Sequence, residues 1–99
     1  MTRSILQRRL VDVSERLKRR RAELGVLEEQ LAFFQEQADD ARLRSLVAET
    51  PLGDLEAREA QRHADAQASQ RDALLRSIAE LVGEQDSLLD RMAAEIAAP

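Results

Sequence analysis

Apolar residues recur at alternating spacings of three and four along both halves of this chain, and this repeat restricts the possible folds more than any other feature. In the first half it runs through about six heptads, with only two polar members. A heptad repeat sustained over this length predicts a helix that packs along one stripe against another helix. Its members are Leu6, Leu10, Val13, Leu17, Arg20, Leu24, Leu27, Leu31, Phe34, Ala38, Ala41, Ser45 and Ala48.

The second half continues the same spacing after a break. Its repeat consists of Ala57, Ala60, Ala64, Gln67, Arg71, Leu74, Ile78, Leu81, Gln85, Leu88 and Met92. From Leu74 onward, further apolar residues stand beside these positions, namely Leu75, Val82, Leu89 and Ile96. The apolar stripe of the second half is therefore wider than contact with a single helix requires.

The only interruption of the repeat lies at the middle of the chain, in the stretch TPLGD. Thr50 is a good N-cap, and Pro51 suits the first position of a helix because its missing N–H would be unsatisfied there in any case. An alternative places the N-cap at Asp54, with Gly53 in the loop. We expect one domain over residues 1–99, with helices over about 3–49 and 54–97 and a turn over about 50–53.

Three features predict that the two helices run antiparallel, side by side. The connection is short. Residues 1–21 carry eight basic and two acidic side chains, whereas residues 80–99 carry one basic and five acidic ones. Pairing residues whose numbers sum to about 102 places Phe34 opposite Ala64 and Ala68, so that large meets small. The predicted fold is all-α, a two-helix antiparallel coiled-coil hairpin.

Two helices leave many apolar side chains without cover. The surplus residues predict a partner helix, and we expect a homodimer that forms a four-helix bundle. The residues expected to bind the partner are Phe33, Leu75, Val82, Leu89 and Ile96.

Composition argues against several classes of function. The chain has no cysteine, one histidine and two aromatic residues, so disulfides, ordinary zinc sites and base-stacking platforms lack their residues. No apolar run approaches the ~20 residues of a membrane span, and the N-terminus has no signal-peptide core. No nucleophile stands with a base. We expect a cytoplasmic protein without cofactor, metal or membrane contact, and not an enzyme.

The densest basic cluster is RLKRRR, which contains Arg16, Lys18, Arg19, Arg20 and Arg21. One interpretation is phosphate binding. The other is a solvated face that pairs with Glu80, Glu84 and Asp86, and the net charge of −4 favours it, so nucleic acid is not an expected partner. Arg20 lies within the repeat, and it predicts a polar layer with Gly83, Glu84 and Gln85.

Acidic residues gather just after the turn, at Asp54, Glu56 and Glu59. One interpretation is favourable placement near a helix N-terminus, with Asp54 and Glu56 in the first turn. The other is a functional acidic tip. His63 lies nearby with Asp65 and Glu59, and a lone exposed histidine is more often without a special role than a ligand.

The tip sequence Gly53-Asp54-Leu55 resembles the N-terminal hairpin of the Gre transcript-cleavage factors, whose tip pattern is G-D-L-x-E-N-A-E-Y. Beyond these three residues the pattern differs, since Ala57, Arg58 and Gln61 stand where the family has Glu, Asn and Tyr. The resemblance implies an acidic tip that enters the secondary channel of bacterial RNA polymerase and approaches its catalytic magnesium.

Two functional hypotheses follow. The first is a non-enzymatic, self-associating interaction or adaptor protein. Nearly all basic residues are arginine, and Lys18 is the sole lysine. This bias is typical of GC-rich genomes, and we therefore expect a bacterial source. The alternative is a regulator that inserts its acidic tip into RNA polymerase. Neutralising the acids Asp54, Glu56 and Glu59 should abolish regulation of RNA polymerase but leave an adaptor function intact.

Overall fold

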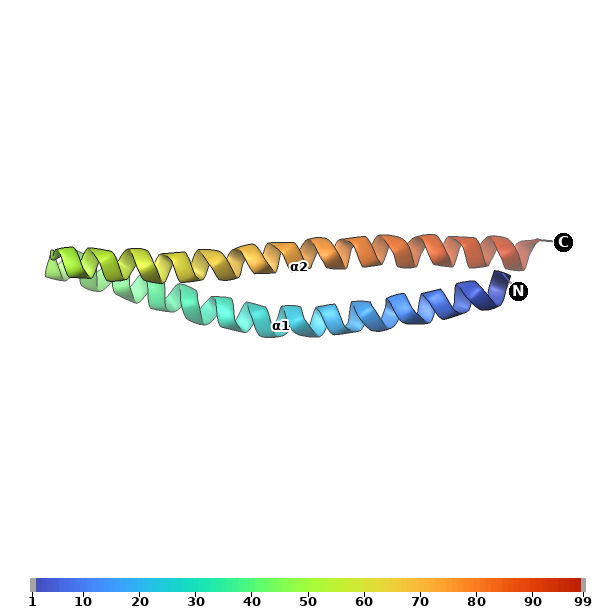
Figure 1. The fold of residues 1–99 in the computed structure, drawn as a ribbon, viewed down its shortest axis with the longest axis horizontal. Helices are drawn as coiled ribbons and strands as arrows, with labels where there is room; N and C mark the ends of the chain where they lie inside the picture. The colour runs from blue at the N-terminus through green and yellow to red at the C-terminus, as the bar shows by residue number, and fades with distance from the viewer. Residues whose placement is uncertain (1, 99) are drawn as a thin grey trace. The chain divides into compact units, whose positions relative to one another are not determined.

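A computed structural model describes residues 2–98 as two long helices joined by a two-residue turn (Figure 1). Helix α1 spans Thr2–Ala48 and α2 spans Pro51–Ala97. The predicted all-α, two-helix hairpin is therefore confirmed. Helix α2 begins three residues before the expected position 54, because the turn is shorter than predicted.

The turn is built by Thr50 and by the residue before it. The backbone N–H of Gly53 donates to Oγ1 of Thr50 at 3.1 Å, and that of Asp54 donates to the Thr50 carbonyl at 3.1 Å. Thr50 is thus the N-cap and Pro51 the first helical residue, so the alternative N-cap at Asp54 is wrong. Glu49 takes a left-handed conformation with φ of 52°, a common way for the backbone to leave a helix.

The chain packs as two compact units, each made of one segment from either helix. The first unit combines Met1–Glu23 with Leu74–Pro99 and is called the terminal unit here. Its core consists of the buried Leu6, Val13 and Leu88, with Leu10, Leu81 and Met92 packed against them. All six residues belong to the heptad repeats, so the repeat predicts this core correctly.

The second unit, Leu24–Ala73, contains the turn and is called the turn unit. Its buried residues are small, namely Ala38, Ala41, Ser45 and Ala64. Gly53 lies so near α1 that a Cβ at this position would come within 3.4 Å of the Ser45 Cα and 3.1 Å of the Thr50 Oγ1. Small residues on both helices therefore let the two backbones approach closely beside the turn.

Burial follows the heptad repeat with two exceptions, Arg20 and Ala48, which are exposed. Arg20 turns to Glu23 of its own helix, 3.3 Å away. The polar layer predicted around Arg20 is therefore wrong. A different polar pair, Ser14 and Gln85, forms within the terminal unit, where the Gln85 amide donates to the Ser14 hydroxyl at 3.2 Å.

The contacts between the helices also correct the predicted register. Ser45 contacts Asp54, and Ser14 contacts Gln85. The numbers of these paired residues sum to 99, not to about 102. The shift follows from the turn, which is centred between Glu49 and Thr50 rather than near residue 51.

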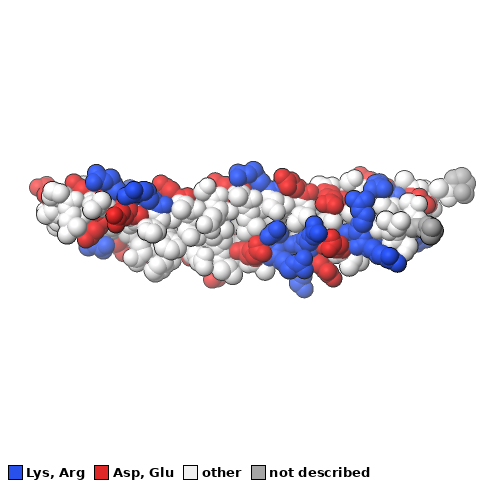
Figure 2. All heavy atoms as spheres, in the orientation of Figure 1, with Lys and Arg blue, Asp and Glu red and all other residues white. Residues whose placement is uncertain are grey.

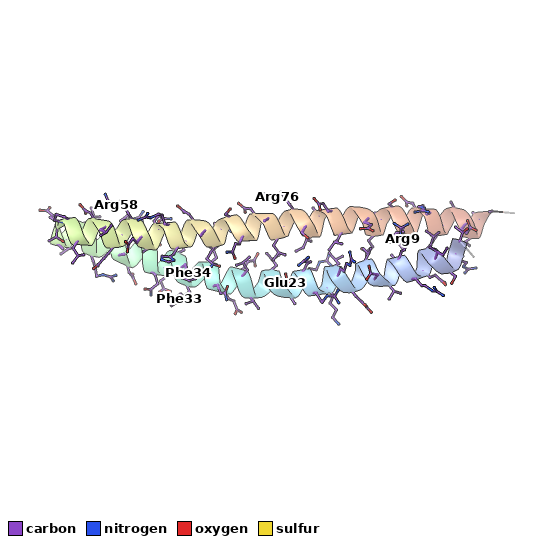
Figure 3. All side chains as sticks on the ribbon, in the orientation of Figure 1. Arg9, Glu23, Phe33, Phe34, Arg58 and Arg76 are labelled. Carbon is purple, nitrogen blue, oxygen red and sulfur yellow. The ribbon has the colours of Figure 1, made fainter. Side chains whose placement is uncertain are left out.

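The two phenylalanines occupy different environments. Phe34 is partly buried, and its ring stacks on His63 of α2 with centroids 6.1 Å apart and an interplanar angle of 12°. Phe33 meets Phe34 edge to face at 5.7 Å and remains 57% exposed. Figure 3 shows Phe34 on the side of α1 toward α2 and Phe33 on its outer side.

Substitution of Phe34 by alanine should therefore destabilise the fold more than the same change at Phe33. Truncation of a fully buried phenylalanine costs about 3–5 kcal/mol, and a partly buried one in this thin core should cost about half of that. Phe33→Ala should cost less than about 1 kcal/mol. Urea unfolding followed by circular dichroism measures both changes. A larger loss for Phe33→Ala would show that the outer phenylalanine is the one covered in solution.

Candidate functional site

The first acid after the turn has a structural partner. Oδ1 of Asp54 accepts a hydrogen bond from the Ser45 hydroxyl at 2.5 Å, in a partly buried position. Asp54 also lies in the first turn of α2, where the helix dipole favours a negative charge. This residue therefore ties α2 to the last turns of α1 and stabilises the start of α2.

The other two acids are differently placed. Glu56 and Glu59 are exposed, as Asp54 is, but they lie beyond the first turn of α2, so the prediction that put Glu56 in that turn is wrong. Glu56 follows Pro51, the first residue of α2, by more than the roughly 3.6 residues of one helical turn. Only Asp54, of the three acids singled out by the sequence, makes a contact that holds the turn together.

Metal-binding groups do not gather in the part of the chain that the structure describes. Within residues 2–98 no three side chains of His, Cys, Asp or Glu lie together as a metal site. His63 stacks on Phe34, and Asp65 accepts a hydrogen bond from Gln61 at 2.9 Å. Of the two neighbours that sequence proximity suggested for His63, Asp65 is therefore engaged by Gln61, whereas Glu59 lines the same open hollow as His63.

The basic cluster Arg16–Arg21 lies on the exposed surface of α1 apart from Leu17. Arg16 pairs with Asp12 at 3.2 Å and Arg20 with Glu23 at 3.3 Å, all on α1. The predicted pairing of this cluster with Glu80, Glu84 and Asp86 is therefore wrong, since every ion pair among the described residues stays within one helix. Figure 2 shows the basic side chains with acidic side chains on both sides of them.

An apolar row follows the C-terminal part of α2, within the terminal unit. It contains four residues spaced by seven, of which Val82 is partly buried. The other three are Leu75, Leu89 and Ile96, which are 42%, 48% and 60% exposed. A spacing of seven places these side chains on one side of the helix, beside the stripe that contacts α1. All four are among the residues expected to bind a partner.

A second apolar surface lies in the turn unit around Phe33, the fifth expected partner-binding residue. Val26 and Phe33, both more than half exposed, line a shallow groove with Phe34 and Gln67. Oε1 of Gln67 is buried there and has no hydrogen-bond partner among the described residues. A buried acceptor without a donor weakens this part of the contact between the helices.

A third apolar surface surrounds the turn and was missed by the sequence reasoning, which considered only the acids there. Leu43, Leu46 and Val47 on α1 are 61%, 67% and 87% exposed. Leu52 and Leu55 on α2 are 64% and 41% exposed. The available signal was the spacing of three and four between the α1 residues, away from the heptad repeat. These five residues are called the turn cluster below.

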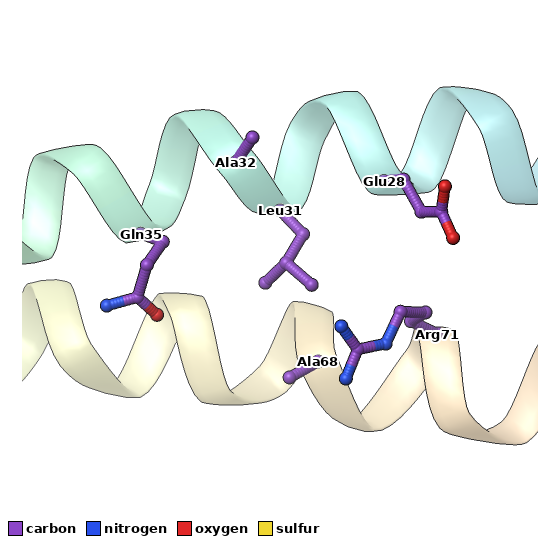
Figure 4. A pocket seen from close by; sticks show the side chains of 6 residues that line it. All are labelled: Glu28, Leu31, Ala32, Gln35, Ala68 and Arg71. Carbon is purple, nitrogen blue, oxygen red and sulfur yellow. The ribbon is translucent and has the colours of Figure 1, made fainter.

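The grooves along the turn unit are open rather than enclosed. One is lined by Glu28, Leu31, Ala32, Gln35, Ala68 and Arg71 (Figure 4). Arg71 is engaged with Asp72 at 3.2 Å. Such a groove does not exclude water from a bound molecule, which catalysis in a pocket generally requires.

Comparison with known proteins gives no relative for this chain, because no family model, no curated protein and no solved structure matches it. Neither helix, over residues 2–98, combines the length and the apolar character needed to cross a membrane.

Asp54→Asn should lower the free energy of unfolding, because it weakens the bond from Ser45 and removes a charge from the start of α2. The expected loss is about 1 kcal/mol. Glu56→Gln and Glu59→Gln are matched controls, since both acids are exposed, and each should stay within about 0.5 kcal/mol of the wild type. Chemical unfolding measures all three. Equal losses at the three positions would contradict a special role for Asp54.

Proposed function

We propose that this chain is a non-enzymatic coiled-coil interaction protein that associates with itself and serves as an adaptor or regulator in the bacterial cytoplasm. The observation that carries the proposal is an imbalance between core and surface. Among the described residues, seven hydrophobic residues are buried, and three of these are alanines. Twelve large hydrophobic residues are exposed.

The imbalance has a large energetic consequence. Full burial of one Val, Leu, Ile or Phe side chain contributes about 1.5–3 kcal/mol relative to exposure. The chain exposes 7272 Å² of surface, whereas a compact chain of its mass, 11.2 kDa, exposes about 5,700 Å². A partner that covers an exposed apolar row recovers part of this unused stabilisation, so association is favoured over the isolated hairpin.

The distribution of the exposed residues supports two different contacts. The row of Leu75, Val82, Leu89 and Ile96 has the spacing of a helix–helix contact, which favours association through α2. The turn cluster lies on both helices next to their connection, and its five side chains are 41% to 87% exposed, so a partner protein can reach them from outside. We assign self-association to the row and adaptor contacts to the turn cluster.

A regulator that inserts its tip into RNA polymerase is the weaker proposal. It needs acids that are free to approach a metal ion held by another protein. Asp54, the acid within the Gly53-Asp54-Leu55 match, is instead bonded to Ser45. Close to it in sequence stand two exposed apolar side chains of the turn cluster, Leu52 at 64% and Leu55 at 41% exposure.

The wild-type protein should associate at micromolar concentrations. Sedimentation equilibrium should give about twice the monomer mass, and the melting temperature should rise with protein concentration, because association stabilises the folded state by mass action. Circular dichroism on the same samples reports whether the helices are intact.

A fully helical protein that sediments as a monomer at all accessible concentrations, with a melting temperature independent of concentration, would contradict self-association. A helical dimer that melts at a concentration-dependent temperature supports it.

A further inference from the structure

The exposed row on α2 is part of a complete second heptad stripe. Between its large residues lie Ala79, Asp86 and Ala93, all exposed. The seven positions alternate at spacings of four and three, in the same way as the stripe that contacts α1. They are Leu75, Ala79, Val82, Asp86, Leu89, Ala93 and Ile96, and together they are called the second stripe.

The second stripe lies wholly within the terminal unit and is separate from the core of that unit. The core residues on α2 are Leu81, Leu88 and Met92. Leu75, Val82 and Leu89 each come directly after a residue of the stripe that contacts α1, namely Leu74, Leu81 and Leu88. Consecutive residues are about 100° apart around a helix. The two stripes therefore face different directions, and α2 can contact α1 and another helix at the same time.

We propose that the second stripe binds the second stripe of another copy of this chain, with the two α2 helices antiparallel. The proposal deepens the self-association proposed above and rests on it. Its first support is the regular alternation along the stripe. Large side chains stand at every seventh position, and a smaller or acidic side chain stands between each two of them. A contact between two identical surfaces related by a two-fold axis requires a surface that is complementary to itself, and this alternation lets the large residues of one copy face the smaller residues of the other.

The sizes of the side chains select the antiparallel orientation. In a parallel pair, each residue faces the same residue of the other copy, so leucine would face leucine and alanine would face alanine. In an antiparallel pair, each layer combines a large residue of one copy with a smaller residue of the other. The large residues are Leu75, Val82, Leu89 and Ile96, and the smaller ones are Ala79, Asp86 and Ala93. Large against small fills the layers evenly and lets the helices pack closely.

Asp86, the single polar member of the second stripe, favours the same orientation. A parallel pair places the two Asp86 carboxylates directly opposite each other in an apolar contact, where like charges repel strongly. An antiparallel pair offsets them along the helices. A polar residue at one position of an apolar stripe specifies orientation and register at a cost in affinity.

The charges of the terminal unit fit a second copy better than a strongly charged partner. Residues 1–23 carry eight basic and three acidic side chains, and residues 74–99 carry two basic and five acidic ones. The two segments have opposite signs and leave a formal charge of only about +2, so two copies experience little net repulsion. A second copy also brings its own basic α1 segment toward the acidic segment of α2.

Four substitutions test the stripe by sedimentation equilibrium on the full chain. Leu89→Ser should weaken self-association by at least about tenfold. Val11→Ser is its control, because Val11 is 58% exposed but lies on α1, outside the second stripe, and it should leave self-association unchanged. Asp86→Leu should strengthen self-association by about tenfold. Glu80→Leu adds the same side chain to α2 outside the stripe and should have little effect.

The outcomes separate this inference from the proposed function. A wild-type protein that stays monomeric overturns both. A dimer that Leu89→Ser leaves intact, or that Val11→Ser weakens equally, overturns the second stripe as the contact but leaves self-association standing. Asp86→Leu is expected to increase the affinity of self-association. If circular dichroism shows intact helices and the affinity does not increase, misfolding is not the cause, and the result contradicts the second stripe directly.

Discussion

A helix in contact with one other helix can bury only one stripe of its side chains, and this constraint governs the whole structure. Over residues 2–98 the contact between α1 and α2 buries seven hydrophobic residues. The terminal unit uses leucine and valine for this purpose, and the turn unit uses mostly alanine. Twelve large apolar side chains in this part of the chain stay exposed to water. The function proposed for this chain follows from that excess.

The turn shows how a thin core is supplemented by polar contacts. Thr50 caps α2, Gly53 allows close approach to α1, and the Ser45 hydroxyl bonds Asp54 across the two helices. These contacts explain why an acid follows the turn without invoking a ligand. They also set the register, since the close approach at Gly53 and Ser45 determines which layers meet in the turn unit. The acids Glu56 and Glu59 remain available to solvent or to a partner.

Much of the fold could be predicted from the spacing of apolar residues. Leu6, Val13 and Leu88 are buried where the heptad repeat places them, because a period of three and four specifies one face of a helix. The exposure of Arg20 and the register in which the two helices pair could not be predicted from this pattern. Arg20 is long enough to leave the stripe and pair with Glu23. The register depends on the left-handed conformation of Glu49, which neither its residue type nor the repeat indicates.

The candidate surfaces were only partly accessible to sequence reasoning. The row around Leu89 was found because it widens the repeat. The turn cluster was missed because its members, such as Val47 and Leu52, lie outside the repeat, where isolated apolar residues are common on protein surfaces. Their shared exposure becomes evident only once the turn brings both helices together.

Distances between spin labels on two copies of α2 test the account most directly, and the absence of cysteine from the chain allows clean single labels. Arg76→Cys and Gly83→Cys place labels seven residues apart, at exposed positions beside the second stripe. Antiparallel pairing predicts a short distance between labels at 83 and a much longer one at 76, with axial offsets that differ by roughly 21 Å. Equal short distances at both positions would indicate parallel pairing, and no measurable distance at 83 would show that the second stripe does not bind another copy.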